Sequence, residues 1–136
     1  MPRSRLRAAS FSIAVMASVA VLGVPGCKSS QEAGKGMQAE IVDGRIVVPV
    51  ELDDYVIRMP TTIPPGTIDF NVKNVGTHVH NVKIVGDGVN SSLAENLQAG
   101  QSAVLTLPLN PGVYRVTCPI GPHAALGMRL DLTVTD

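Results

Sequence analysis

Aromatic residues, cysteine and histidine are all scarce in this chain of 136 residues, which contains no Trp, two Phe, two Tyr, two Cys and three His. Two cysteines are too few for a disulfide-rich scaffold. The 11 basic and 11 acidic side chains balance to zero, which argues against a nucleic-acid partner recognised through a basic face. A charged fraction of 16% beside 45% apolar residues excludes a disordered chain. The length therefore predicts one modest globular domain.

The N-terminal segment differs in composition from the rest of the chain. Arg3, Arg5 and Arg7 precede a charge-free run from Ala8 to Cys27. A basic start, an apolar stretch and a small-residue cleavage site are typical of a secretory signal peptide, which residues 1–26 are predicted to form. An uncleaved membrane anchor is the alternative, since about 20 residues can span a bilayer.

The signal segment ends in Val24-Pro25-Gly26-Cys27, which resembles the bacterial lipobox. In that motif the cysteine receives a lipid and becomes the first residue of the exported protein, so the resemblance implies lipid attachment at Cys27. We expect a protein on the periplasmic face of a bacterial membrane, anchored by that lipid. Without lipid, a disulfide between Cys27 and Cys118 is an alternative, because the compartment is oxidising.

The exported part has its own charge balance. From Cys27 onward the chain keeps 8 of the 11 basic and all 11 acidic side chains, for a net charge of −3. Residues 27–39 are rich in Ser, Gly, Gln and Lys without apolar periodicity, which predicts a flexible linker with a reach of about 20 Å. The linker either lets a tethered domain turn toward a partner or acts only as a spacer. The domain itself is expected over residues 40–136.

From Glu40 onward, short β-branched runs alternate with Gly, Pro and Asn. In residues 67–73, Ile68, Phe70 and Val72 alternate with polar side chains, the period of two of a half-buried strand. Residues 128–135 alternate in the same way. Further strands are expected at 41–42, 45–50, 55–59, 81–85, 102–109 and 113–118. Seven or eight short strands predict an all-β fold, an antiparallel sandwich or barrel. Residues 92–95 match a capping box and predict one short helical turn.

The metal-capable side chains fall into two groups. His78 and His80 lie between two predicted strands, while Cys118, His123 and Met128 lie together between the last two. Two His and one Cys with a weak axial Met is the blue-copper arrangement. Zinc also suits Cys and His, but the methionine favours copper. Taken singly, each residue also fits a structural role, as a buried thiol, a core methionine or a surface histidine.

The order and spacing of these residues resemble the cupredoxins, the family of plastocyanin, azurin and rusticyanin. The matching pieces are Asn74-x-Gly76-x3-His80-Asn81, Pro111-Gly112-x-Tyr114-x3-Cys118, His123 and Met128. The Cys-x4-His-x4-Met loop, ending in Ala-Ala-x-Gly-Met, is most similar to that of rusticyanin. The resemblance covers residues 40–136 and implies a Greek-key β-sandwich that binds one copper ion through His80, Cys118, His123 and Met128.

The resemblance also implies roles for residues near the ligands. Asn81 is expected to tie the two ligand loops together and to point its backbone N–H at the thiolate. His78 is expected at the rim of the site, with a ligand role as the alternative. Around His123 lies an uncharged set that is expected to form an electron port and docking patch, with ordinary loop packing as the alternative: Pro119, Ile120, Pro122, Ala124 and Leu126.

These features predict a mononuclear type 1 copper protein that carries single electrons outside the cytoplasmic membrane. Redox proteins such as cytochromes, oxidases or copper reductases are the expected partners, and a monomer is expected. The alternative is a copper-trafficking protein with the same ligands. An enzyme is not expected, because the ligand loop has one cysteine and the chain has only three histidines.

Overall fold

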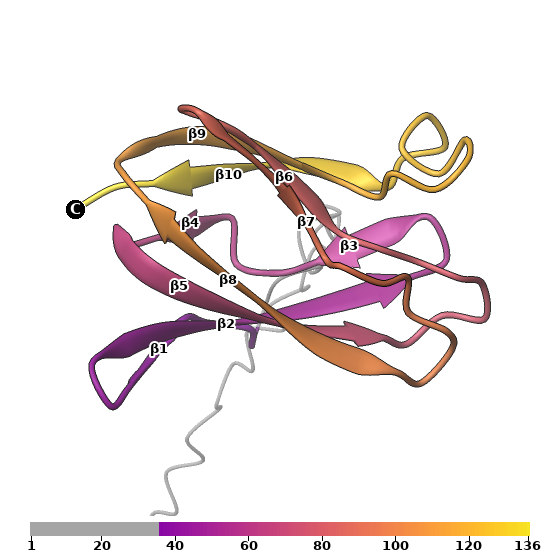
Figure 1. Cartoon of the computed structure of the whole chain (residues 1–136), viewed down its shortest axis with the longest axis horizontal. Coiled ribbons are helices and arrows are strands. Elements are labelled where there is room, and N and C mark those ends of the chain that lie inside the picture. The colour runs from indigo at the N-terminus through magenta and orange to yellow at the C-terminus, as the bar shows by residue number, and fades with distance from the viewer. Residues whose placement is uncertain (1–35) are drawn as a thin grey trace, which may run out of the picture.

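The computed structural model describes residues 36–136, which form ten strands and no helix (Figure 1). The strands are β1 (Glu40–Val42), β2 (Arg45–Asp53), β3 (Val56–Arg58), β4 (Thr62–Ile63), β5 (Gly66–Asn74), β6 (Lys83–Gly86), β7 (Val89–Ser92), β8 (Ser102–Leu109), β9 (Gly112–Thr117) and β10 (Arg129–Val134). The predicted signal peptide, the predicted lipid-attachment residue Cys27 and most of the predicted linker lie outside the described residues. Within residues 36–136, no helix is long and apolar enough to cross a membrane.

Two sheets pack face to face. One has the order β1-β2-β5-β8, with β3 also paired to β2, and the other has the order β4-β10-β9-β6-β7. The all-β sandwich predicted from the sequence is therefore confirmed. Most strand pairs are antiparallel, as predicted, but β2 pairs in parallel with β5 and β4 pairs in parallel with β10. Parallel partners come from separate parts of the chain, so local patterns do not reveal them.

The core lies between the sheets and follows the predicted alternation. Ile68, Phe70 and Val72 of β5 are fully buried, and in the register of the sheet they lie opposite Ile46, Val48 and Val50 of β2. The second sheet contributes a matching apolar face: Ile84, Tyr114, Val116, Leu132 and Val134. Burial of each large apolar side chain contributes about 1.5–3 kcal/mol, so these strands form a firm base for the loops at their ends.

The helical turn predicted at residues 92–95 was wrong. β7 continues to Ser92, and the backbone that follows bends without forming a helical turn. The side chains of Leu93 and Leu97 are both buried in the core, and the backbones of Leu97 and His80 form an antiparallel bridge with N···O distances of 2.8 and 3.0 Å. Core packing thus overrides the local capping signal and fixes the backbone of His80.

The two segments that carry the predicted ligands meet at one end of the sandwich. The loop of residues 118–128 connects β9 to β10, and residues 75–82 connect β5 to β6. Both connections lie at the same end in Figure 1, opposite the end at which β10 reaches the C-terminus. The sandwich therefore brings together His80 and Cys118, which are 38 positions apart in the sequence.

Candidate metal centre

Three predicted ligands present their donor atoms to one point. The ligand atoms of His80, Cys118 and His123 lie within 4.8 Å of one another. The Sγ of Cys118 is 3.9 Å from Nδ1 of His80 and 3.5 Å from Nδ1 of His123. Metal–sulfur and metal–nitrogen bonds of about 2.3 and 2.0 Å place sulfur and nitrogen about 3.7 Å apart in a trigonal plane. The observed spacing therefore fits ligands of one shared ion.

Met128 lies beside this cluster as the last residue of the ligand loop. Its backbone N–H donates to the carbonyl of His123 at 3.0 Å, and its carbonyl accepts from the N–H of Cys118 at 3.0 Å. The methionine side chain is fully buried. A thiolate, two imidazoles and a thioether form the soft donor set that suits copper, so the residues present fit a single copper ion.

The ligand loop is short and internally hydrogen-bonded. It leaves β9 after Thr117 and enters β10 at Arg129, and these two residues face each other in the hairpin. Within the loop, the N–H of His123 donates to Ile120 and the N–H of Leu126 donates to Pro122, both at 3.0 Å. These turns, together with two prolines that restrict the backbone, hold the three loop ligands in a fixed relation.

Only one of the four predicted ligands reaches the surface. His80 and Met128 are 0% exposed and Cys118 is 1% exposed, whereas His123 is 9% exposed. Burial, followed by the repulsion that a proton on His80 or His78 adds, lowers the pKa of His123 below its ordinary value. The neutral imidazole is the form that ligates metals, so the surroundings of His123 favour the ligating state.

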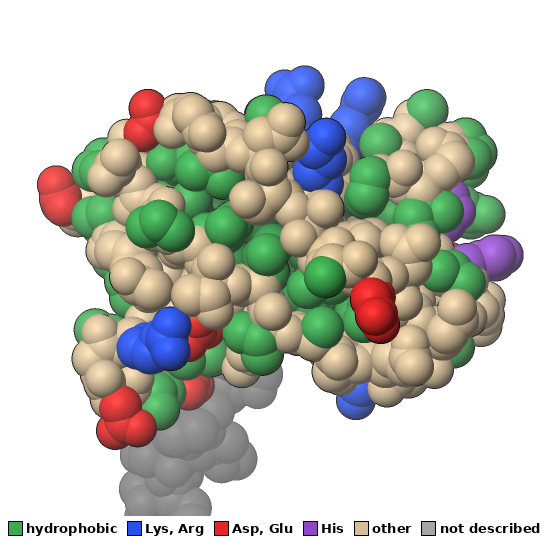
Figure 2. Space-filling model, viewed as in Figure 1, with side chains coloured by type: hydrophobic (Ala, Val, Ile, Leu, Met, Phe, Trp, Pro, Cys, Tyr) green, Lys and Arg blue, Asp and Glu red, His purple; other side chains and the backbone are tan. Residues whose placement is uncertain are grey.

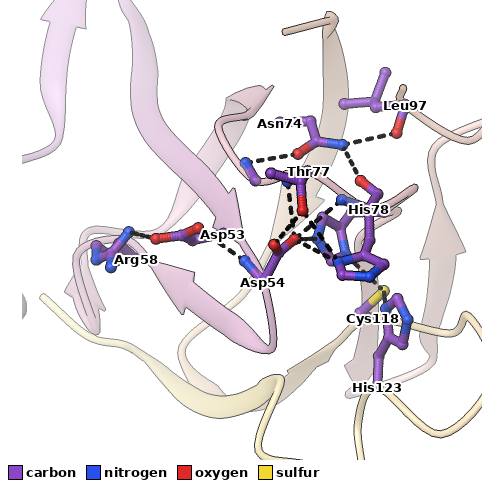
Figure 3. A network of polar contacts seen from close by, with 11 residues as sticks. Asp53, Asp54, Arg58, Asn74, Thr77, His78, Leu97, Cys118 and His123 are labelled. Carbon is purple, nitrogen blue, oxygen red and sulfur yellow. Dashed lines mark hydrogen bonds and ion pairs between the residues drawn. The ribbon is translucent and has the colours of Figure 1, made fainter. Parts of the chain in front are cut away.

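Asp54, which no sequence pattern marked, contacts the segment that carries His80 (Figure 3). Asp54 lies in the turn between β2 and β3. Its Oδ1 accepts from the backbone N–H groups of Thr77 and His78 at 3.0 and 3.1 Å, and lies 3.1 Å from Nε2 of His80. Its Oδ2 accepts from the Thr77 hydroxyl at 2.6 Å. These hydrogen bonds, that of the Thr77 hydroxyl first, hold the pKa of Asp54 well below its usual range.

Asn74 fixes the same segment from the other side. Its buried Nδ2 donates to the carbonyls of His78 and Leu97 at 2.8 and 2.9 Å. Its Oδ1 accepts from the N–H of Gly76 at 2.9 Å. One side chain thus joins the end of β5, the backbone that leads to His80, and Leu97, which pairs with His80. These contacts explain the Asn74-x-Gly76 spacing.

Asn81 makes different contacts from those expected. Its Nδ2 donates to Oδ1 of Asn96 at 2.8 Å and to the carbonyl of Leu93 at 3.3 Å. None of the hydrogen bonds among residues 36–136 joins Asn81 to Cys118 or to the ligand loop. The side chain therefore ties the start of β6 to the segment after β7, because the buried Leu93 draws that segment over it. A hydrogen bond from the Asn81 N–H to the thiolate stays a prediction.

The rim of the site is formed by His78, Tyr55 and the uncharged patch. His78 is 55% exposed in its side chain and lies 3.1 Å from Asp54 through Nδ1, outside the cluster of three donors. In the predicted patch, Pro119, Pro122 and Leu126 are exposed, while Ile120 and Ala124 are half-buried. Figure 2 shows histidine side chains at this end of the molecule beside hydrophobic ones.

Comparison with known proteins adds a family match. The family model described as "Sulfocyanin (SoxE) domain" matches residues 53–136, and a search of curated proteins found no match. Among solved structures, dithionite-reduced auracyanin from Roseiflexus castenholzii is 22% identical with a TM-score of 0.58, covering 66% of this chain and 97% of its own. Auracyanin B is 21% identical with a TM-score of 0.58, covering 76% and 97%. Reduced rusticyanin is 18% identical with a TM-score of 0.55, covering 74% and 91%.

Proposed function

Because the chain belongs to the sulfocyanin family of cupredoxins, we propose that it carries single electrons between redox proteins through one type 1 copper ion. Cupredoxins are typically single-copper electron carriers. The observation that carries the proposal is the buried cluster of His80, Cys118 and His123, with Met128 held against it by the ligand loop. Bound copper supplies a one-electron couple between Cu(I) and Cu(II).

The surroundings of the ligands suit this role. A rigid loop and the bridge between His80 and Leu97 keep the donor atoms in place, so little rearrangement accompanies a change of charge. Burial of Cys118 and Met128 keeps water from the sulfur ligands. The exposed edge of His123 offers one route to a partner. One electron enters from a reduced donor protein and one leaves to an oxidised acceptor, and no bond forms or breaks.

A visible spectrum with electron paramagnetic resonance of the Cu(II)-loaded protein tests the proposal. We expect an intense thiolate-to-copper absorption that Cys118→Ala abolishes. His78→Gln serves as the matched control, since His78 is an imidazole of the same segment outside the donor cluster, and it should leave the colour intact. A colourless Cu(II) complex, or a colour independent of Cys118, would reject the electron-carrier function.

Copper trafficking is the second candidate function. The soft sulfur donors favour Cu(I), and the partly exposed His123 is a route by which the ion can leave. A trafficking protein should release copper readily to a chelator or a partner. An electron carrier should instead give reversible voltammetry and rapid self-exchange, and should retain copper against the same chelator.

The proposal extends to location and partners. We propose that the protein is exported, anchored through a lipid on Cys27 to the periplasmic face of a membrane, monomeric, and engaged with redox proteins rather than with nucleic acid. We also propose that it is not an enzyme, since the ligand loop supplies one cysteine and the chain only three histidines. Mass spectrometry of the exported N-terminus tests the anchor, and an unmodified Cys27 would reject it. Sedimentation of the copper-loaded protein tests the monomer.

A further inference from the structure

We propose that Asp54 is a positioning residue of the metal centre. It holds His80 in the tautomer whose Nδ1 lone pair faces Cys118, and its hydrogen bond to His80 favours Cu(II) over Cu(I). The inference rests on the proposed ligand role of His80. It concerns a residue 26 positions away in the sequence, in the turn between β2 and β3.

The hydrogen-bond pattern fixes the proton on the His80 ring. Oδ1 of Asp54 already accepts from the backbone N–H groups of Thr77 and His78, so it is an acceptor whatever the state of the ring. Nε2 of His80, at 3.1 Å from the same oxygen, must therefore donate. A neutral imidazole carries one N–H, which leaves the lone pair on Nδ1, and Nδ1 is the atom 3.9 Å from the thiol sulfur.

The carboxylate is itself held in place by its neighbours. The backbone N–H of Asp54 donates to Asp53 Oδ1 at 2.8 Å, and Asp53 in turn binds Arg58 at 2.8 Å (Figure 3). Gly76 leaves the space that the carboxylate needs, since a Cβ there would lie 2.5 Å from Asp54 Oδ1 and 3.1 Å from His80 Nε2. The backbone N–H groups of Thr77 and His78 and the Thr77 hydroxyl donate to the Asp54 carboxylate, and the missing side chain at Gly76 leaves room for it, so the carboxylate is held in one orientation.

The negative charge of Asp54 affects which copper ion the site prefers. A carboxylate that accepts the distal N–H of a ligating histidine orients the ring and raises its basicity. A more basic imidazole stabilises the more highly charged ion, so the contact favours Cu(II). Because His80 is fully buried, water does not compete for the same N–H.

The first test uses the metal-free protein and needs no copper. Nitrogen-15 NMR of the imidazoles should show the His80 proton on Nε2 in the wild type. Asp54→Asn keeps an acceptor oxygen and should keep this tautomer, whereas Asp54→Ala should give a mixture of both tautomers. A wild-type proton on Nδ1, or an unchanged tautomer in a folded Asp54→Ala variant, would overturn the proposal.

The second test measures affinities for Cu(II) and Cu(I) by chelator competition in Asp54→Asn. We expect Cu(II) affinity to fall about 10- to 100-fold, the usual cost of removing such a contact, with a smaller change for Cu(I). Each tenfold loss of affinity for Cu(II) relative to the affinity for Cu(I) raises the reduction potential by about 59 mV. Asp131→Asn is the matched control, because it removes the same charge from an aspartate whose hydrogen bond and ion pair are with Arg115 and not with Asp54 or His80.

The outcomes separate this inference from the proposed function. Equal shifts in Asp131→Asn and Asp54→Asn would show a general charge effect and overturn the role of Asp54. A wild-type protein that binds Cu(II) without colour would instead reject the electron carrier, while the tautomer in the metal-free protein would still decide whether Asp54 positions His80.

Discussion

The ring of Tyr55 stands edge-on to the imidazole of His123, with centroids 5.2 Å apart and planes at 85°. Tyr55 follows Asp54 in the tight turn between β2 and β3 and adopts a left-handed backbone with φ of 63°. That conformation costs a side-chain-bearing residue about 1–2 kcal/mol. The turn that directs Asp54 toward one histidine thus also places Tyr55 against the other.

Replacement of Tyr55 should loosen His123. Tyr55→Ala keeps the backbone strain but removes the edge contact, which contributes about 0.5–1.5 kcal/mol beyond buried area. We expect a loss of about 1 kcal/mol in the free energy of unfolding of the metal-free protein, measured in urea, and faster chemical modification of His123. Tyr55→Phe is the control and should behave like the wild type. Equal modification rates in the Ala and Phe variants would show that the ring does not cover His123.

Gly76→Ala should disrupt the Asp54 contacts by steric conflict. The added Cβ would lie 2.5 Å from Asp54 Oδ1 and 2.9 Å from the Asp54 backbone nitrogen, and overpacking of this kind costs about 1–3 kcal/mol. Gly112→Ala is a matched control, because its Cβ would meet nothing closer than 3.7 Å and its backbone is not left-handed. Urea unfolding of both variants measures the difference. Similar stabilities would contradict the close approach at Gly76.

Asn74→Ala should be among the more damaging polar substitutions. It removes three hydrogen bonds, to the carbonyls of His78 and Leu97 and from the N–H of Gly76, and each such bond contributes about 0.5–1.5 kcal/mol. We expect a loss of at least about 2 kcal/mol in the free energy of unfolding, measured by urea denaturation. Asn110→Ala removes an exposed hydrogen bond of 3.3 Å to Asp87 and should cost about 0.5 kcal/mol or less.

The lowered pKa of His123 predicts a pH dependence of the metal-free protein. The unfolded chain takes up a proton near pH 6.5, while the folded protein does so only at lower pH because of burial. The contribution of His123 is therefore complete above about pH 6.5, is lost as the pH falls, and levels off below the folded-state pKa. Proton NMR titration of His123 should give a lower midpoint in the folded protein than in urea. A higher midpoint in the folded state would reverse the sign.

A charge in the uncharged patch should slow electron exchange. Leu126 is 58% exposed on the ligand loop, and Val104 is 59% exposed on β8. Leu126→Glu should lower the self-exchange rate about tenfold, whereas Val104→Glu should leave it nearly unchanged, because like charges at a contact face repel. NMR line broadening in mixtures of oxidised and reduced protein measures the rate. Equal slowing by both substitutions would place the docking surface elsewhere.

The sequence predicted the features that depend on local periodicity and spacing. Ile68, Phe70 and Val72 were expected on the buried face of a strand, and burial confirms this. The Cys-x4-His-x4-Met spacing between two alternating runs placed the ligand loop on a hairpin, which the pairing of β9 with β10 confirms. His80 was drawn from elsewhere in the chain, and it lies with Cys118 and His123 in one cluster.

Features set by distant partners could not be predicted. Asp54 and Tyr55 lie in a tight turn that has no metal-binding pattern, and their importance appears only when that turn reaches His80 and His123, which belong to distant segments of the chain. The capping signal at residues 92–95 failed because burial of Leu93 and Leu97 stabilises the protein more than one short helical turn would. Asn81 contacts the same segment rather than the ligand loop for the same reason.

The parallel pairing of Thr62 and Ile63 with Thr133 and Val134 also bears on how the protein reaches its native state. This pairing joins positions separated by about half of the chain, and folds rich in such distant contacts reach the native state in milliseconds to seconds. The edge strand β4 has no partner in the second sheet until β10, the last strand of the chain, pairs with it. The loop that precedes this strand holds three of the four ligands, and the pairing of β9 with β10 closes it. A chain truncated before β10 should therefore lose its copper affinity together with its cooperative folding.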